Sequence, residues 1–233
     1  EKFRKKFSFL DKTRKDYWNR TSFNFDQWKY LKKEAEKKKL IFICSPFSLK
    51  AVDYLNALKV KYWKIASGEF NNKLMIDKIV SKSNSPLILS TGLATKYEID
   101  KVVKYLKFKK KKFSLLYCVS SYPTSLEKIN LKKMSEYKKI YKIPVGISDH
   151  SGNKNVLFTG ISLGAEFLEA HVTFSKNFFG PDNSSSITFE ELKEVVNFRN
   201  IFYELVNNKP KKQKDLSKMR NLFCQSLKLN KNK

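Results

Sequence analysis

Histidine and cysteine are scarce in this 233-residue chain, which has two of the former and three of the latter. Cys44, Cys118 and Cys224 are odd in number, lie far apart in the sequence and form no C-x-x-C pair. A disulfide framework needs an even set of cysteines, and a structural zinc site needs paired ligands. The cysteines therefore argue against both, and we expect a protein of the reducing cytoplasm.

Long apolar runs are also missing. The apolar stretches are short and end in lysine or polar residues, whereas a membrane-spanning helix needs about 20 apolar residues. No signal peptide opens the chain. Its first residue is Glu1 rather than methionine, so we expect an upstream part of the protein to precede it. We predict a soluble protein with no membrane partner.

Acidic residues are few beside the basic ones: 22 against 48, for a formal net charge of +26. Such a charge suits nucleic acid, because displaced counterions would favour binding to phosphate backbones. The lysines are spread over many helical segments, including residues 33–40, 107–113 and 210–215, without a recognition helix or a stacking motif. We therefore interpret them as solvated helix faces and expect no nucleic-acid partner. The positive field is compatible with an anionic small substrate.

Short apolar runs alternate with longer segments of helical spacing from residue 40 onward. Capping boxes open two of these helices, Thr95 with Glu98 and Thr188 with Glu191. The predicted strands are residues 40–47, 62–69, 86–92, 113–120, 144–150 and 166–173, and the predicted helices are residues 23–39, 48–58, 71–81, 95–107, 130–140, 153–164 and 188–206.

Apolar strands joined by helices indicate a parallel sheet with both faces covered. Periodicity alone leaves a doubly wound sheet and a (β/α)₈ barrel open. Each run ends in polar residues, and the carboxyl ends of successive strands meet at one point only in a barrel. We therefore expect an α/β barrel of the TIM type with about six of its eight strands, the first two lying upstream of Glu1. Residues 1–39 would precede the third barrel strand, residues 40–206 would form βα units 3 to 8, and residues 207–233 would be a basic linker.

The two histidines end consecutive predicted strands, His150 in "GISDH" and His171 in "LEAHV". A lone histidine in an apolar strand is usually a core residue, but two at neighbouring carboxyl ends can share a metal ion. Imidazole with oxygen donors suits Mn²⁺, Fe²⁺, Co²⁺ or Zn²⁺, and two ligands leave positions open for water and substrate. Asp149 is a candidate to orient one histidine, or else a capping residue.

Lys64 lies inside an apolar strand, where an ammonium group needs an anion to compensate its lost hydration. With Ser45, Ser67, Ser90 and Ser148 it is predicted to form a phosphate cradle, although each serine alone is as easily a strand-end cap. A buried Lys64–Glu69 pair is the structural alternative. Gly68 and Gly92 follow hydroxyl residues and would let a ligand approach the backbone closely.

These motifs resemble the sialic acid synthase family, which includes N-acetylneuraminate, legionaminate and pseudaminate synthases. The resemblance extends from about residue 40 to residue 206. It implies condensation of phosphoenolpyruvate with an N-acetylated aldehyde sugar such as N-acetylmannosamine, with release of phosphate, so the chain is expected to be a transferase of sialic acid biosynthesis. The segments that carry it are, in order, "YWKIASGE", "LILSTG", "YCVSSYPT", "GISDHSG", "GAEFLEAHVTFSKNFFGPD" and "SITFEEL".

The resemblance also implies roles for single residues. His150 and His171 match the family's metal ligands, usually for Mn²⁺. Two positions depart from the family pattern: Ser120 replaces a common asparagine near the substrate carboxylate, and Ala170 replaces a lysine. Matches to phosphoenolpyruvate-binding positions are Ser45, Lys64, Ser67, Ser90 and Ser148, and matches to positions facing the sugar are Glu69, Tyr122 and Asp182.

In relatives, an antifreeze-like carboxyl-terminal domain completes the partner's site in a homodimer, and the resemblance implies that residues 207–233 lead toward it. We therefore expect these 233 residues alone to be weakly active or inactive, and the full-length form to be a homodimeric synthase. Two alternatives stay open: another phosphoenolpyruvate-condensing barrel, of the 3-deoxy keto acid sugar phosphate type, and a non-catalytic remnant barrel. Residues 11–23 are either a lid over the barrel mouth or a plain surface loop.

Overall fold

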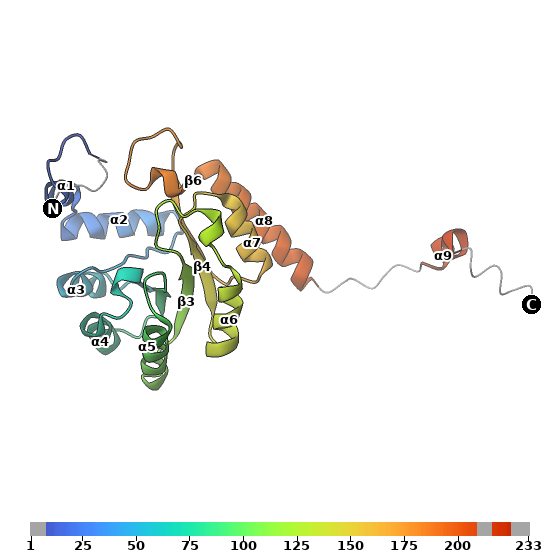
Figure 1. The fold of residues 1–233 in the computed structure, drawn as a ribbon, viewed down its shortest axis with the longest axis horizontal. Coiled ribbons are helices and arrows are strands. Elements are labelled where there is room, and N and C mark those ends of the chain that lie inside the picture. The colour runs from blue at the N-terminus through green and yellow to red at the C-terminus, as the bar shows by residue number, and fades with distance from the viewer. Residues whose placement is uncertain (1–7, 209–215, 225–233) are drawn as a thin grey trace, which may run out of the picture.

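The computed structural model describes residues 8–208 and 216–224. Within residues 8–208 it shows a curled parallel sheet with helices packed around its outside (Figure 1). The strands are hydrogen-bonded in their chain order, and all the pairs are parallel. This half-barrel matches the predicted TIM-type architecture. Its strands are β1 (Trp63–Ile65), β2 (Leu87–Ser90), β3 (Phe113–Cys118), β4 (Val145–Asp149), β5 (Leu168–Thr173) and β6 (Ser186–Thr188).

From β1 to β5 the strands alternate with helices. The helices that the sequence predicted lie close to their predicted ranges. Both predicted capping boxes are present, Thr95 with Glu98 and Thr188 with Glu191. In the described part of the chain, no helix is both long and apolar enough to cross a bilayer. The helices are α1 (Arg14–Thr21), α2 (Phe25–Lys37), α3 (Leu49–Ala57), α4 (Lys73–Lys82), α5 (Lys96–Phe108), α6 (Lys132–Tyr141), α7 (Lys154–Ser162), α8 (Phe189–Asn207) and α9 (Ser217–Phe223), with short 3-10 turns η1 (Ser67–Glu69), η2 (Leu126–Lys128) and η3 (Asn183–Ser185).

One predicted strand is not a regular strand in the structure, and one strand of the structure was not predicted. Residues 40–47 form only one bridge, Cys44 to Trp63, instead of a regular strand. They lie beside β1 at the edge of the described sheet, where Leu40 and Ile41 are 63% and 52% exposed, so pairing supports them on one side only. The sixth strand is β6, whose single apolar residue, Ile187, gives no strand-like run in the sequence.

The first predicted loop also differs from the structure. Residues 14–21 within it form α1, whose start is fixed by a capping box between Thr13 and Asp16. The sequence carries this signal as a threonine followed three residues later by a carboxylate. The predicted linker from residue 207 lies partly outside the described residues, and the described part includes α9.

The core lies between the convex side of the sheet and the helices. β1 to β4 are buried along their whole length, as expected for a parallel sheet covered on both faces. Fully buried side chains such as Trp63, Leu89 and Leu115 pack with residues of α3 to α5. β5 is only half-buried, because it borders the open concave interior.

Four helices end in a lysine with left-handed backbone geometry. Lys39, Lys59, Lys110 and Lys142 have φ angles of 59°, 52°, 52° and 52°. Gly164, with φ of 81°, occupies the equivalent left-handed position after α7. The left-handed conformation disfavours any residue with a Cβ by about 1–2 kcal/mol, so glycine is the usual choice there.

Replacing such a lysine with glycine should therefore stabilise the fold. We expect Lys110→Gly to raise the free energy of unfolding by about 1 kcal/mol, because relief of strain exceeds the added entropy of the unfolded chain. The matched control is Gly164→Ala, whose Cβ would meet only Lys138 Nζ at 3.8 Å, so strain alone should lower stability. Urea unfolding followed by circular dichroism measures both, and a less stable Lys110→Gly would contradict the argument.

Candidate active site

Lys64 is the central residue of the concave side. Its side chain is 11% exposed and its ammonium donates a hydrogen bond to Ser90 Oγ at 2.8 Å on the neighbouring strand. The same nitrogen lies 3.4 Å from Glu169 Oε1 on β5. Because β1 and β5 are separated by three strands, this ion pair reaches across the interior of the curled sheet. The predicted alternative, a Lys64–Glu69 pair, was wrong.

Ser148 continues the polar chain from β5 to β4. Its hydroxyl donates to Glu169 Oε1 at 2.7 Å and lies 3.3 Å from His150 Nε2. Ser148 is buried, as are Lys64 and Ser90. Side chains from four strands thus form one continuous line of polar contacts, from Ser90 through Lys64, Glu169 and Ser148 to His150.

The two histidines face each other at the carboxyl ends of β4 and β5, with ring centroids 5.5 Å apart. His150 Nδ1 lies 2.9 Å from the carbonyl of Val119 and donates to it, because a carbonyl can only accept. This fixes the tautomer and leaves Nε2 with a lone pair on the side of His171 and Ser148. Burial lowers the pKa of His150, and the hydrogen bond to Val119 partly opposes this shift. A lowered pKa favours the neutral imidazole, which is the form that binds metals.

Two further side chains border the histidines. The Tyr122 ring lies 4.4 Å from that of His150 and 5.9 Å from that of His171, with its hydroxyl 3.4 Å from His150 Nε2. Asp182 Oδ2 lies 3.9 Å from His171 Nδ1. Asp149, a candidate to orient a histidine, instead accepts from the backbone and hydroxyl of Ser151, and the Val119 carbonyl orients His150.

Among the described residues, no group of three or more histidine, cysteine or carboxylate side chains is arranged to hold a metal ion. The possible donor set is therefore the histidine pair, with water and substrate oxygens to complete it. Two imidazole nitrogen donors at neighbouring strand ends fit an open catalytic site rather than a closed structural one.

The other predicted residues lie around this centre. Ser67, after β1, and Ser120, after β3, have hydroxyls 2.9 Å apart. Ser45 lines the same cavity as Lys64, of about 1120 Å³, which extends from the concave side of the sheet to α8. Glu69 stands apart from the polar chain: in the described structure its carboxylate accepts a hydrogen bond from Asn72 at 2.7 Å.

Sequence reasoning missed Glu169. It precedes His171 by two residues on β5, so both side chains lie on the same face of the strand. That spacing was a usable signal, because the inward direction of one predicts the inward direction of the other. Glu169 joins the lysine side of the site to the serine and histidine side.

Gly92 and Gly68, both predicted to allow close approach of a ligand, differ in the structure. A Cβ on Gly92 would lie 2.4 Å from Ser120 Oγ and 2.7 Å from Cys118 Sγ. The absence of a side chain on this glycine therefore leaves room for the side chains of Ser120 and Cys118. A Cβ on Gly68 would meet nothing within 4 Å, and its φ is ordinary. Its small size is not needed for packing within the described structure.

We expect Gly92→Ala to lower the free energy of unfolding by about 1–3 kcal/mol through overpacking. Gly68→Ala, on the same rim, should stay within about 0.5 kcal/mol of the parent. Thermal or urea unfolding of the two variants side by side tests the packing. Equal stabilities would mean that Ser120 and Cys118 move aside freely.

Comparison with known proteins shows the family of the chain. The family described as the NeuB family matches residues 1–210. The N,N'-diacetyllegionaminic acid synthase of Campylobacter jejuni is 39% identical over 162 residues, covering 68% of this chain and 48% of that protein. Human N-acetylneuraminate-9-phosphate synthase is 32% identical over 204 residues, covering 84% of this chain and 56% of that protein.

Among solved structures, the N-acetylneuraminic acid (sialic acid) synthetase of Leptospira borgpetersenii serovar Hardjo-bovis superposes with a TM-score of 0.77 at 29% identity. The match covers 88% of this chain and 73% of that one. The chain spans about half the length of the curated relatives it matches. With the family pattern matched over most of its length, and with relatives that are at least 32% identical over more than two thirds of the chain, the chain belongs to the NeuB family.

Proposed function

We propose that this chain forms the substrate-binding barrel of an enzyme that condenses phosphoenolpyruvate with an N-acetylated aldehyde sugar, releasing phosphate. The observation that carries the proposal is the buried Lys64 ammonium, which lines a cavity together with the hydroxyl-bearing Ser45 and Ser148. A cation in that position favours an anionic ligand, and membership of the NeuB family indicates which anion.

The contacts of Lys64 leave it able to bind that anion. An ammonium group has three protons to donate. One goes to Ser90 and a second faces Glu169, so a third is available to a phosphate or carboxylate oxygen in the cavity. Ser45 and Ser148 line the same cavity with hydroxyls of their own, and Ser67 follows the strand that carries Lys64.

We assign His150 and His171 as ligands of a divalent ion, Mn²⁺ being our first choice. The fixed tautomer of His150 and the 5.5 Å between the rings support this donor pair. When bound there, such an ion supplies Lewis acidity toward the aldehyde oxygen of the sugar. Tyr122, and Asp182 beside His171, border the position that the sugar would occupy.

The reaction itself forms a bond between carbon 3 of phosphoenolpyruvate and the aldehyde carbon. Positive charge then develops at carbon 2, water adds there, and the C–O bond to phosphate breaks. Lys64 and the serine hydroxyls hold the phosphate while its charge grows, and donors fixed in advance need no reorganisation at that moment. Holding both substrates in one cavity supplies most of the remaining acceleration.

Removal of the Lys64 charge should abolish tight binding of phosphoenolpyruvate. We expect Lys64→Met to weaken the affinity by about 100-fold, in line with the about 1.5–3 kcal/mol of a charge-assisted hydrogen bond. Lys128→Met, an exposed lysine on the loop after β3, is the matched control and should bind as the parent does. Titration calorimetry measures both, and equal affinities would contradict the cradle.

Release of phosphate then identifies the reaction class. Phosphoenolpyruvate with N-acetylmannosamine should yield inorganic phosphate, whereas a phosphorylated aldose without an N-acetyl group should not. Release with only the phosphorylated aldose would favour the 3-deoxy keto acid type of synthase. Tight phosphoenolpyruvate binding without turnover on any sugar would place this chain as a binding barrel that needs more of the protein for catalysis.

Loss of either histidine should weaken Mn²⁺ binding. We expect about one ion per chain in the parent, and at least about tenfold weaker binding in His150→Gln and His171→Gln. Electron paramagnetic resonance of free Mn²⁺ during titration measures the affinity. Gly68→Ala, on the same rim, is the control, and unchanged affinity in both histidine variants would overturn the assignment.

A further inference from the structure

Among the segments that connect helices and strands, the lysine excess lies at one end of the strands. The segments that lead from a helix into the next strand or edge segment contain nine lysines and one acidic residue, Glu166. The loops at the carboxyl ends of the strands contain two lysines, Lys128 and Lys176, against three acidic residues. The nine, which we name the amino-terminal face, are Lys38, Lys39, Lys59, Lys61, Lys109, Lys110, Lys111, Lys112 and Lys142.

The charge of this face is not neutralised by neighbours. Among the described residues, none of the nine forms an ion pair, and Glu166 is itself paired with Lys138. Eight of the nine are exposed, and the half-buried Lys111 donates to the backbone carbonyl of Ser83. Parallel neighbouring strands begin at a common edge, so these side chains surround one end of the half-barrel.

Four of the nine occupy the left-handed positions at helix ends, Lys39, Lys59, Lys110 and Lys142. Gly164 fills the equivalent position after α7. Lysine is therefore present where glycine would strain the backbone less. Backbone strain that recurs at equivalent surface positions indicates that the lysine side chains there have a function.

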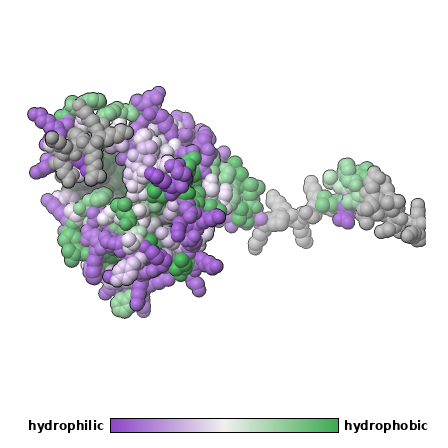
Figure 2. Space-filling model, in the orientation of Figure 1, coloured by the Kyte–Doolittle hydropathy of each residue, from purple (hydrophilic) through white to green (hydrophobic). Residues whose placement is uncertain are grey.

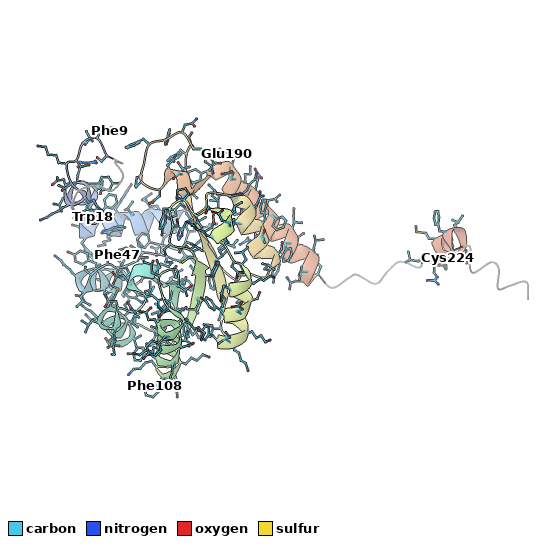
Figure 3. All side chains as sticks on the ribbon, viewed as in Figure 1. Phe9, Trp18, Phe47, Phe108, Glu190 and Cys224 are labelled. Carbon is cyan, nitrogen blue, oxygen red and sulfur yellow. The ribbon has the colours of Figure 1, made fainter. Side chains whose placement is uncertain are left out.

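Large apolar side chains lie among these lysines. Leu40, Phe108, Ile140 and Leu163 follow or end four different helices at the same edge, and they are 63%, 77%, 53% and 44% exposed. Phe108 is labelled at the lower end of α5 (Figure 3), where Figure 2 shows hydrophilic side chains with hydrophobic ones between them. Lysines interspersed with exposed aliphatic and aromatic groups suit the interface of an anionic bilayer.

We infer that the amino-terminal face binds peripherally to membranes rich in anionic phospholipids. Each lysine near such a surface adds to the electrostatic attraction, and the apolar side chains enter the headgroup layer. Nucleic acid would gain little from Leu40, Phe108, Ile140 and Leu163, so the observations favour the bilayer. This revises the expectation from sequence that the lysines are only solvated faces and that the chain has no membrane partner.

The orientation leaves the candidate active site free. The site lies at the carboxyl ends of the strands, and the lysines lie at the opposite ends. A chain attached by the amino-terminal face therefore keeps the carboxyl ends of its strands, with the two histidines, toward solution. The inference is independent of the proposed reaction, because no residue of the amino-terminal face contributes to the site.

Co-sedimentation with vesicles tests the inference. The full chain should bind vesicles of phosphatidylglycerol and phosphatidylcholine, should bind pure phosphatidylcholine far less, and should lose binding as salt rises. The variant Lys39→Gly, Lys59→Gly, Lys110→Gly, Lys142→Gly should bind anionic vesicles at least about tenfold more weakly. It should also unfold at no lower temperature than the parent, because glycine relieves strain at all four positions. A control variant with the same charge change, Lys33→Gln, Lys101→Gln, Lys128→Gln, Lys193→Gln, should bind nearly as the parent does.

Three results would overturn the inference. In the first, the parent does not bind anionic vesicles. In the second, the glycine variant and the glutamine control lose vesicle binding equally. In the third, DNA displaces the parent from the vesicles because the parent binds DNA more tightly. Phe108→Ser separates charge from insertion: severalfold weaker binding supports insertion of the ring, and unchanged binding removes that part of the inference. Phosphoenolpyruvate binding by the glycine variant should equal that of the parent, so failure here and failure of the proposed function are distinguishable.

Discussion

The ion pair between Lys64 and Glu169 is the interaction on which the site depends. In a flat sheet, strands separated by four spacings would lie about 19 Å apart, too far for these side chains to meet. Their separation of 3.4 Å requires the sheet to curl. The same curl brings Ser90, Ser148 and His150 into one polar chain, so the chemistry of the site and the curvature of the fold are a single constraint.

The two ends of the half-barrel divide the polar chemistry between them. The carboxyl ends of the strands hold hydroxyls, imidazoles and the Lys64–Glu169 pair around a cavity. The opposite end carries unpaired lysines that follow helix carboxyl termini, where the helix dipole favours positive charge. That electrostatic preference makes a lysine-rich sequence compatible with the fold, and it concentrates the excess charge away from the reacting groups.

Much of the fold and site could be predicted because the signals are local. Apolar runs of strand length, capping boxes such as Thr95 with Glu98, and polar residues at strand ends each depend on a few neighbouring positions. The failures came where the outcome depends on distant neighbours. Residues 40–47 have the pattern of a strand but find a partner on one side only, and β6 is a strand because Thr173 and its neighbours pair with it. The alternative partner offered for Lys64, Glu69, was wrong for the same reason, since the carboxylate beside it is that of Glu169.

By itself, the sequence determined the α/β class, the order of the elements and the kinds of side chain at each strand end. It also determined the match to the NeuB family, since ordered motifs with fixed spacing survive without knowledge of the coordinates. Only the tertiary structure decided which groups meet: Glu169 with Lys64, Ser67 with Ser120, and the Val119 carbonyl with His150. Pattern along a chain fixes the face on which a side chain lies, whereas contact across a barrel depends on the curvature of the sheet that joins the strands.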